Sequence, residues 1–164
     1  MLPNCSPEEY FALQKAMKLC ASEERSPFYI RQKFYQWGLS KEQSENLIHY
    51  LLEQNFLDEQ RFADAFVRGK FNIKGWGKVK IKTELHSRGI SSQIINTAFQ
   101  QLEIESYKDT RKQLAQKKLK SLKGLSPAEQ RPKLIRYLLS KGYEYEAIIG
   151  ILDNNSSETS LFTD

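Results

Sequence analysis

Lysine and arginine are the side chains of this sequence whose number and spacing could do chemistry. Between Arg68 and Arg88 the chain carries seven of them against one acid, Glu84, and residues 108–123 are similarly basic. Residues 1–66, by contrast, hold ten Asp and Glu against seven Lys and Arg. A solvated surface more often intersperses both signs, so this distribution favours contact with a polyanion or an acidic groove.

Ten of these cations are predicted to form a binding surface. Lys78 and Lys82 are four residues apart and share one helix face, with Ile81 and Leu85 on the opposite stripe. Lysine suits phosphate attraction without base readout. A solvated helix face that binds nothing remains the alternative. The predicted surface comprises Arg68, Lys70, Lys74, Lys78, Lys82, Arg88, Arg111, Lys112, Lys117 and Lys118.

Catalytic and metal chemistry are not indicated. The two histidines, His49 and His86, are far apart in the sequence, and neither has the spaced partners that a general base or a metal site needs. Cys5 and Cys20 form no C-x-x-C pair, which argues against zinc and against a disulfide framework. We therefore expect a protein that is not an enzyme and that holds no cofactor or metal.

The Gly-Trp-Gly at residues 75–77 interrupts the basic stretch. No strand is expected before it and no G-K-[ST] follows, so it is not a phosphate-binding loop. Gly75 and Gly77 are expected to form a tight turn between two helices. Trp76 is expected to pack beneath that turn rather than to stand exposed as a contact.

The composition is that of an ordinary packed chain of 164 residues. Hydrophobic residues make up 40%, charged residues 27%, and the net charge is +5. The N-terminus does not resemble a signal peptide, and no apolar run approaches the roughly 18 residues of a membrane span. We expect a cytoplasmic protein with reduced thiols and no membrane contact.

A repeat underlies the elements that must position these cations. Three segments share apolar residues eight and four positions before a glycine, and one position after it. The glycines are Gly38, Gly89 and Gly142, and the apolar residues before them are Ile30 and Phe34, Ile81 and Leu85, and Leu134 and Leu138. Each apolar pair marks one helical face, and the glycine is expected to end the helix in a left-handed conformation.

A further helix is expected before each of these pairs. The first spans residues 6–21 with Phe11, Leu13, Met17 and Cys20 as its apolar positions. The second spans 58–71 with Phe62, Ala65, Phe66 and Gly69 on one stripe, and the third spans 106–122 with Leu114, Lys118 and Leu122 in line.

These elements predict nine helices in three modules and no strands. The predicted boundaries are 1–55, 56–104 and 105–155, followed by a polar tail, 156–164, that is expected to fray. A module of about 50 residues is marginal alone, so its neighbours should help to bury its hydrophobic face.

The stretch 56–91 carries a spaced pattern of apolar, charged and glycine positions. They are Leu57, Asp58, Arg61, Phe62, Ala63, Phe66, Val67, Arg68, Gly75, Gly77, Ile81, Leu85, Gly89 and Ile90. These positions match the pattern L-D-D-x-R-F-A, an aromatic-V-R, G-x-G, Ile, Leu and G-[IV]. In this pattern the stretch resembles the RecX family, the regulators of the bacterial RecA recombinase. Lys78 stands where the family often has proline. Residues 25–34 are similar to the family's R-S-x-x-E-L-x-x-K-L, with Tyr29 in place of Glu.

The resemblance implies an all-α, curved and elongated chain of three tandem three-helix repeats. It also implies a role: binding RecA, as monomer or filament on single-stranded DNA, and inhibiting its strand exchange, coprotease and ATPase activities. Single-stranded DNA alone would be bound weakly and without sequence preference. We expect a monomer.

Two other classes of protein remain open from the residues alone. One is a helix-turn-helix transcription regulator, with residues 91–102 as its recognition helix, although these carry no Arg or Lys. The other is a neutral helical solenoid that binds proteins with little dependence on salt.

Overall fold

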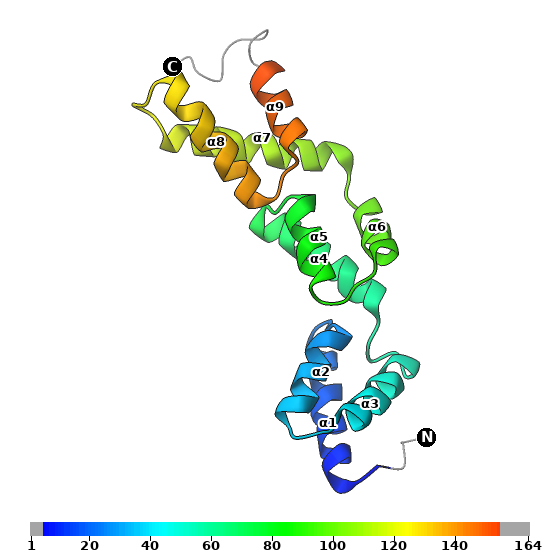
Figure 1. Ribbon diagram of the computed structural model, residues 1–164. Coiled ribbons are helices and arrows are strands. Elements are labelled where there is room, and N and C mark those ends of the chain that lie inside the picture. Colours follow the sequence, from blue (N-terminus) through cyan, green and yellow to red (C-terminus); the bar gives the residue numbers. More distant parts are fainter. Residues whose placement is uncertain (1–4, 155–164) are drawn as a thin grey trace. The chain divides into compact units, whose positions relative to one another are not determined.

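The computed structural model describes residues 5–154, which form nine helices and no strand (Figure 1). The predicted all-α architecture of three three-helix repeats is confirmed. The module boundaries at 55/56 and 104/105 stay predictions, and the tail 156–164 lies outside the described residues. The helices are α1 (Pro7–Ser22), α2 (Pro27–Gln36), α3 (Lys41–Glu53), α4 (Glu59–Lys74), α5 (Lys78–His86), α6 (Ser92–Gln100), α7 (Ile104–Ser121), α8 (Pro127–Lys141) and α9 (Tyr145–Asn154).

The helices group into two compact units whose limits do not follow the repeats. The first comprises the described residues up to Phe66 together with Leu85–Ala98. The second comprises Val67–Glu84 together with the described residues from Phe99 onward. Helices α4 and α5 therefore contribute residues to both units.

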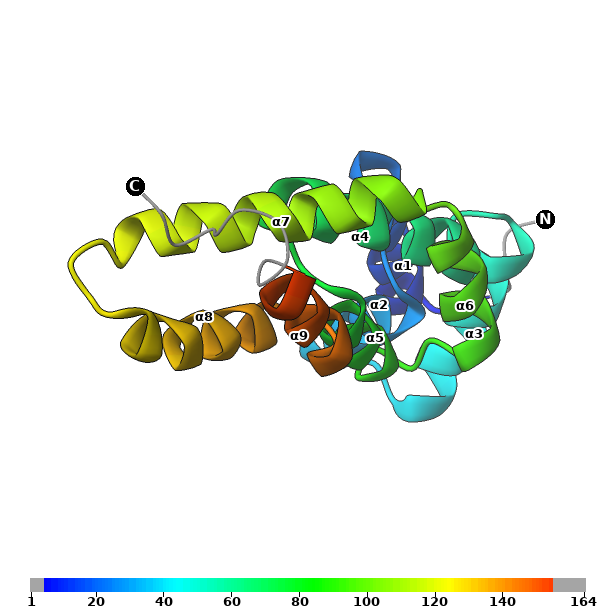
Figure 2. The ribbon, with the colours of Figure 1, turned by 90° about the horizontal axis from the view of Figure 1, so that it is seen from above.

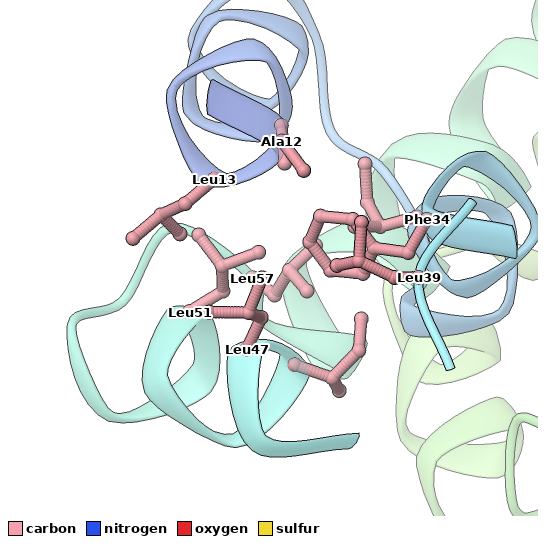
Figure 3. Close-up of a cluster of buried hydrophobic side chains, with 10 residues drawn as sticks. Ala12, Leu13, Phe34, Leu39, Leu47, Leu51 and Leu57 are labelled. Carbon is pink, nitrogen blue, oxygen red and sulfur yellow. The ribbon is translucent and has the colours of Figure 1, made fainter. Parts of the chain in front are cut away.

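The core of the first unit is built by α1, α2, α3 and the segment that follows α3 (Figure 3). Its buried residues are Ala12, Leu13, Ala16, Ile30, Phe34, Leu39, Leu47, Ile48, Leu51 and Leu57. Two helices of this core, α1 and α3, each begin with a capping box, formed by Ser6 with Glu9 and by Ser40 with Gln43. These caps supply partners for backbone N–H groups that a helix leaves unpaired at its start.

The three glycine pivots are confirmed and have a common geometry. Gly38, Gly89 and Gly142 have φ of 88°, 78° and 88°, in the left-handed region. At each one, the N–H after the glycine donates to the carbonyl five residues earlier, for example Ile90 N to Leu85 O at 3.1 Å. This is a Schellman motif, in which apolar residues at these two positions pack together as the helix ends. The repeated apolar residues four before and one after each glycine are therefore the two sides of that contact.

The predicted apolar faces of the first helices are wrong in part. Leu13 is buried as predicted, but Phe11 is 65% exposed, and Ala12 and Ala16 complete the buried face of α1. Alanine lets helices approach closely and carries little hydrophobic signal, so a scan for large side chains misses such a face.

The same error occurs, by about one residue, in the other two modules. On α4, Phe62 is buried as predicted, but it is joined by Ala63, Val67 and Phe71, whereas Ala65, Phe66 and Gly69 are only half-buried. On α7 it is Tyr107, Ala115 and Leu119, whereas Leu114, Lys118 and Leu122 are half-buried. By contrast, Ile81 and Leu85 are fully buried on α5, as predicted.

A backbone contact joins the second and third repeats inside the second unit. Gly77 N donates to Lys141 O at 2.8 Å, and Val79 N donates to Gly142 O at 3.0 Å. A Cβ on Gly77 would overlap the Gly142 carbonyl, and a Cβ on Gly142 would overlap Lys80. The start of α5 can thus meet the end of α8 only because both positions are glycine.

Helices α7 and α8 lie side by side in both ribbon views and form the body of the third repeat (Figure 2).

Three aromatic rings of the second unit are in contact with one another. Phe71 and Tyr107 have ring centroids 5.7 Å apart, and Tyr107 and Tyr143 are 5.3 Å apart. Since Phe71 comes from α4 and Tyr107 from α7, these rings add an apolar contact between the repeats to the backbone hydrogen bonds.

The core of the first unit gives a test by two identical substitutions. Phe34→Ala should lower the free energy of unfolding by about 3–5 kcal/mol, because Phe34 is fully buried. Phe11→Ala should change it by less than about 1 kcal/mol, because that ring is exposed. Urea unfolding followed by circular dichroism measures both. Equal losses would show that α1 is rotated relative to the structure.

Gly77, which contacts the end of α8, gives a second test. Replacing it with alanine should lower the stability, whereas the same replacement at Gly69 should raise it. Gly77→Ala should destabilise by about 1–3 kcal/mol, because the methyl group overlaps backbone. Gly69→Ala should stabilise by about 0.5–1 kcal/mol, because it lies within α4 with no atom within 4 Å of the added carbon. The melting temperatures of the two variants measure these changes. A Gly77→Ala protein that melts at the same temperature as the unsubstituted protein would contradict the contact between α5 and α8.

Candidate nucleic-acid interface

The ten predicted cations divide by exposure and by unit. Five are exposed and five are half-buried, and all but Arg88 belong to the second unit. The exposed ones are Arg68, Lys74, Lys82, Lys112 and Lys117. The half-buried ones are Lys70, Lys78, Arg88, Arg111 and Lys118. The candidate interface therefore belongs to the second unit and does not include Arg88.

Four of the half-buried cations lie over aromatic rings. The Lys78 ammonium is 5.0 Å from the centroid of Tyr107, and the Arg88 guanidinium is 5.0 Å from that of Phe66. Lys78 therefore packs its stem into the repeat junction instead of standing beside Lys82 on an open face. Arg111 has a buried Nε with no hydrogen-bond partner among the described residues, which also marks it as partly structural.

Trp76 is flanked by two lysines. Its ring is half-buried, which differs from the predicted packing beneath the turn. The Lys80 ammonium is 4.5 Å from the ring centroid and the Lys70 ammonium is 5.0 Å from it. Trp76 N donates to Lys70 O at 3.1 Å, and Gly75 holds the turn with φ of 60°. The turn between α4 and α5 thus presents an aromatic ring together with two positive charges.

The end of α8 brings one further cation, Lys141, to the same turn and also binds Lys80. Lys80 Nζ donates to Ser140 O at 3.2 Å, and Lys141 Nζ donates to Lys74 O at 3.3 Å. The Lys141 ammonium also lies 5.8 Å from the centroid of Tyr137. Lysines near the last carbonyls of a helix are favoured by its dipole.

A second lysine shares the Tyr137 ring and completes the group. Lys118 of α7 places its ammonium 5.4 Å from the Tyr137 centroid. We call this group the lysine–aromatic cluster. It consists of Lys70, Lys80, Lys118 and Lys141 around Trp76 and Tyr137.

Sequence reasoning missed half of this cluster. Lys80, Tyr137 and Lys141 are not among the residues of the predicted surface. Lys141 lies 67 residues from its partner Lys74 along the chain. The sequence does contain one signal for Lys141. The Gly142 pivot marks the C-terminal end of α8, and the dipole of a helix favours lysines there.

Tyr107 links the start of α5 to the third repeat. Its hydroxyl accepts from Lys78 N at 3.0 Å and donates to Glu144 Oε2 at 2.8 Å. Burial raises the pKa of Tyr107 above its ordinary value, and it raises the pKa of Tyr143 to about 12. Both hydroxyls therefore stay protonated at neutral pH. The Glu144 carboxylate, just before α9, is thereby bound to a residue of α7.

The described residues show no grouping suited to metal chemistry. Within residues 5–154 no three His, Cys, Asp or Glu side chains gather as metal ligands would. Burial raises the pKa of Cys20 to about 11, so its thiol is not activated as a nucleophile. No helix in this part of the chain has the length and apolar character to cross a membrane.

The fold and this surface define a tandem three-helix repeat protein with a basic second unit. Residues 58–98 match the family model described as RecX, second three-helix domain, and residues 108–152 match RecX, third three-helix domain. The chain is 30% identical over 152 residues to regulatory protein RecX of Cronobacter sakazakii, covering 87% of this chain and 90% of that protein. It therefore belongs to the RecX family of regulatory proteins.

Other relatives agree in fold but differ in length. Regulatory protein RecX of Clostridium botulinum is 33% identical over 137 residues, which cover 82% of this chain but 64% of that relative. A crystal structure of regulatory protein RecX superposes with a TM-score of 0.80 at 22% identity, covering 89% of this chain and 72% of the other. RecX from Lactobacillus salivarius gives 0.79 at 19% identity, covering 92% and 97%. These two structures show a shared fold.

Two buried tyrosines test the junction. Tyr107→Phe should destabilise by about 1–3 kcal/mol, because it leaves Lys78 N–H and a Glu144 oxygen without a partner. Tyr143→Phe should be nearly neutral at pH 7, because its buried hydroxyl makes no hydrogen bond among the described residues. Urea midpoints compare them, and a larger loss for Tyr143→Phe would contradict the network.

The raised pKa of Tyr143 makes the stability of the protein depend on pH. Tyr143 ionises near 10 when unfolded and near 12 when folded, so the unfolded state releases its proton first. Its contribution to stability is complete below pH 10 and is lost as pH rises toward 12. Tyr143→Phe should therefore gain stability relative to the unsubstituted protein across that window.

Proposed function

We propose that this chain inhibits the RecA recombinase by binding RecA, as monomer or as filament on single-stranded DNA, and so regulates recombination and repair. The observation that carries the proposal is membership of a family whose curated members are named regulatory protein RecX. The chain spans about two thirds of the length of the clostridial relative that it matches.

The charge of the second unit supports a partner that contains DNA. Its exposed Lys74, Lys82 and Lys117 are ammonium groups that suit phosphates without selecting a base sequence. Binding to naked single strands is then weak and independent of sequence. The protein acts as a monomer, in the cytoplasm where RecA and the chromosome lie, and it catalyses no reaction itself.

The helix-turn-helix alternative is disfavoured by α6. That helix would serve as the recognition helix, yet its sequence SQIINTAFQ has no charged residue. A helix that enters the major groove normally brings lysine or arginine to the phosphates, and α6 has neither, although Gln93, Asn96 and Gln100 supply amides. The other alternative, a neutral helical solenoid, is tested by the experiment below, because its binding would depend only weakly on salt.

The test is the ATPase activity of RecA on single-stranded DNA, titrated with this protein. Inhibition is expected at low salt, and it should weaken as salt rises. The double substitution Lys82→Glu, Lys117→Glu should reduce inhibition about tenfold or more, since each lost phosphate contact removes a share of the electrostatic affinity.

A matched double substitution serves as the control. Lys18→Glu, Lys41→Glu changes the same amount of charge at exposed positions of the first unit, and inhibition should persist. Both variants should keep their helical circular dichroism. Equal inhibition by the two folded variants would show that the basic surface is only solvated. No inhibition by the unsubstituted protein, or a footprint on a specific duplex site, would refute the proposed function.

A further inference from the structure

We infer that Trp76 is a stacking platform for a base of single-stranded nucleic acid, with Lys70 and Lys80 taking the adjoining phosphates. This inference deepens the proposed function and rests on it for the choice of a nucleic-acid partner. It assigns to one aromatic ring a role that charge alone would not provide.

The geometry places one ring and two cations within a single nucleotide's reach. The two ammonium groups lie 5.0 and 4.5 Å from the Trp76 ring centroid. Trp76 sits in the turn between α4 and α5, where Gly75 and Gly77 carry no side chain that could shield it. An aromatic ring beside lysines is the combination by which proteins hold single strands, since every base offers a flat face and every nucleotide a phosphate.

The turn also exposes apolar side chains that a protein core would normally bury. Ile73, three residues before Trp76, is 78% exposed, and Val79, three residues after it, is 51% exposed. Leu139, next to the Ser140 carbonyl that holds Lys80, is 45% exposed. A surface that is both apolar and cationic fits unpaired bases on a charged backbone better than it fits a duplex, whose bases are already stacked.

The lysines on the ring do not block it. Each ammonium is carried by a flexible four-carbon stem, and an exposed cation–π contact is weaker than a base stacked on tryptophan. An arriving base can replace an ammonium on the ring, and the displaced ammonium can pair with a phosphate of the same strand. The Trp76 ring and the ammonium group therefore each have a favourable partner both in the free protein and in the complex.

The protein's two tryptophans allow this to be observed directly. Trp37 lies in the first unit, with its ring 6.0 Å from that of Phe34, and Trp76 lies in the second. Trp37→Phe therefore leaves Trp76 as the sole tryptophan, and Trp76→Phe leaves Trp37. Oligothymidylate, at low salt and without RecA, should quench the fluorescence of the Trp37→Phe protein and leave that of the Trp76→Phe protein unchanged.

An abasic strand of the same length separates stacking from charge. It keeps the phosphates and lacks bases, so it should quench Trp76 little. By fluorescence anisotropy of a labelled oligothymidylate, Trp76→Ala should weaken binding about 5- to 100-fold, and Trp76→Phe, which keeps a ring, should weaken it less. Affinity for the abasic strand should be the same for both variants. Circular dichroism checks that each variant is folded.

Equal quenching by the abasic strand, or binding of oligothymidylate with no quenching, would overturn the inference. Unchanged affinity of a folded Trp76→Ala protein would do the same. These outcomes are independent of the proposed function, because RecA inhibition could persist with an unstacked Trp76. Conversely, stacking on naked strands with no effect on the RecA ATPase would retain this inference and refute the proposed function.

Discussion

The start of α5 and the end of α8 are joined backbone to backbone, and much of the second unit depends on that contact. Gly77 N and Val79 N donate to the carbonyls of Lys141 and Gly142, and Lys78 N donates to the Tyr107 hydroxyl. The first N–H groups of one helix thus meet the last carbonyls of another, which satisfies both ends and aligns their dipoles favourably. Side chains at the two glycines would separate the backbones.

This contact explains why cations gather where they do. A helix end rich in carbonyl oxygens attracts ammonium groups, and Lys80 donates to Ser140 O while Lys141 donates to Lys74 O. The lysine–aromatic cluster is therefore partly a consequence of docking two repeats. Lys80 and Lys141 each bind a neutral carbonyl oxygen at these contacts, so the contacts themselves add no negative charge that would offset the two ammonium groups toward a polyanion.

Features set by a few neighbouring residues could be predicted from the sequence, and features set by distant packing could not. The pivot at Gly89 needed only the local rule that a left-handed residue ends a helix, and Leu85 and Ile90 followed from it. The exposed Phe11 and the buried Ala12 depend on which face α1 turns to α3, and hydrophobicity alone misjudged it. The sequence showed that residues 68–88 are basic, but the pairing of Lys141 with Lys74 required the fold.

The two glycines of the turn between α4 and α5 meet two different constraints, although they belong to one motif. In the G-x-G of this turn, Gly75 has φ of 60° and meets a conformational demand, whereas Gly77 has an ordinary φ and meets a demand for space. The residue between them is held by these two requirements at the turn, where its ring lies against Lys70 and Lys80. The docking that excludes a side chain at residue 77 therefore also fixes where Trp76 stands. Stability of the repeat junction and presentation of the aromatic ring are consequences of the same backbone contact.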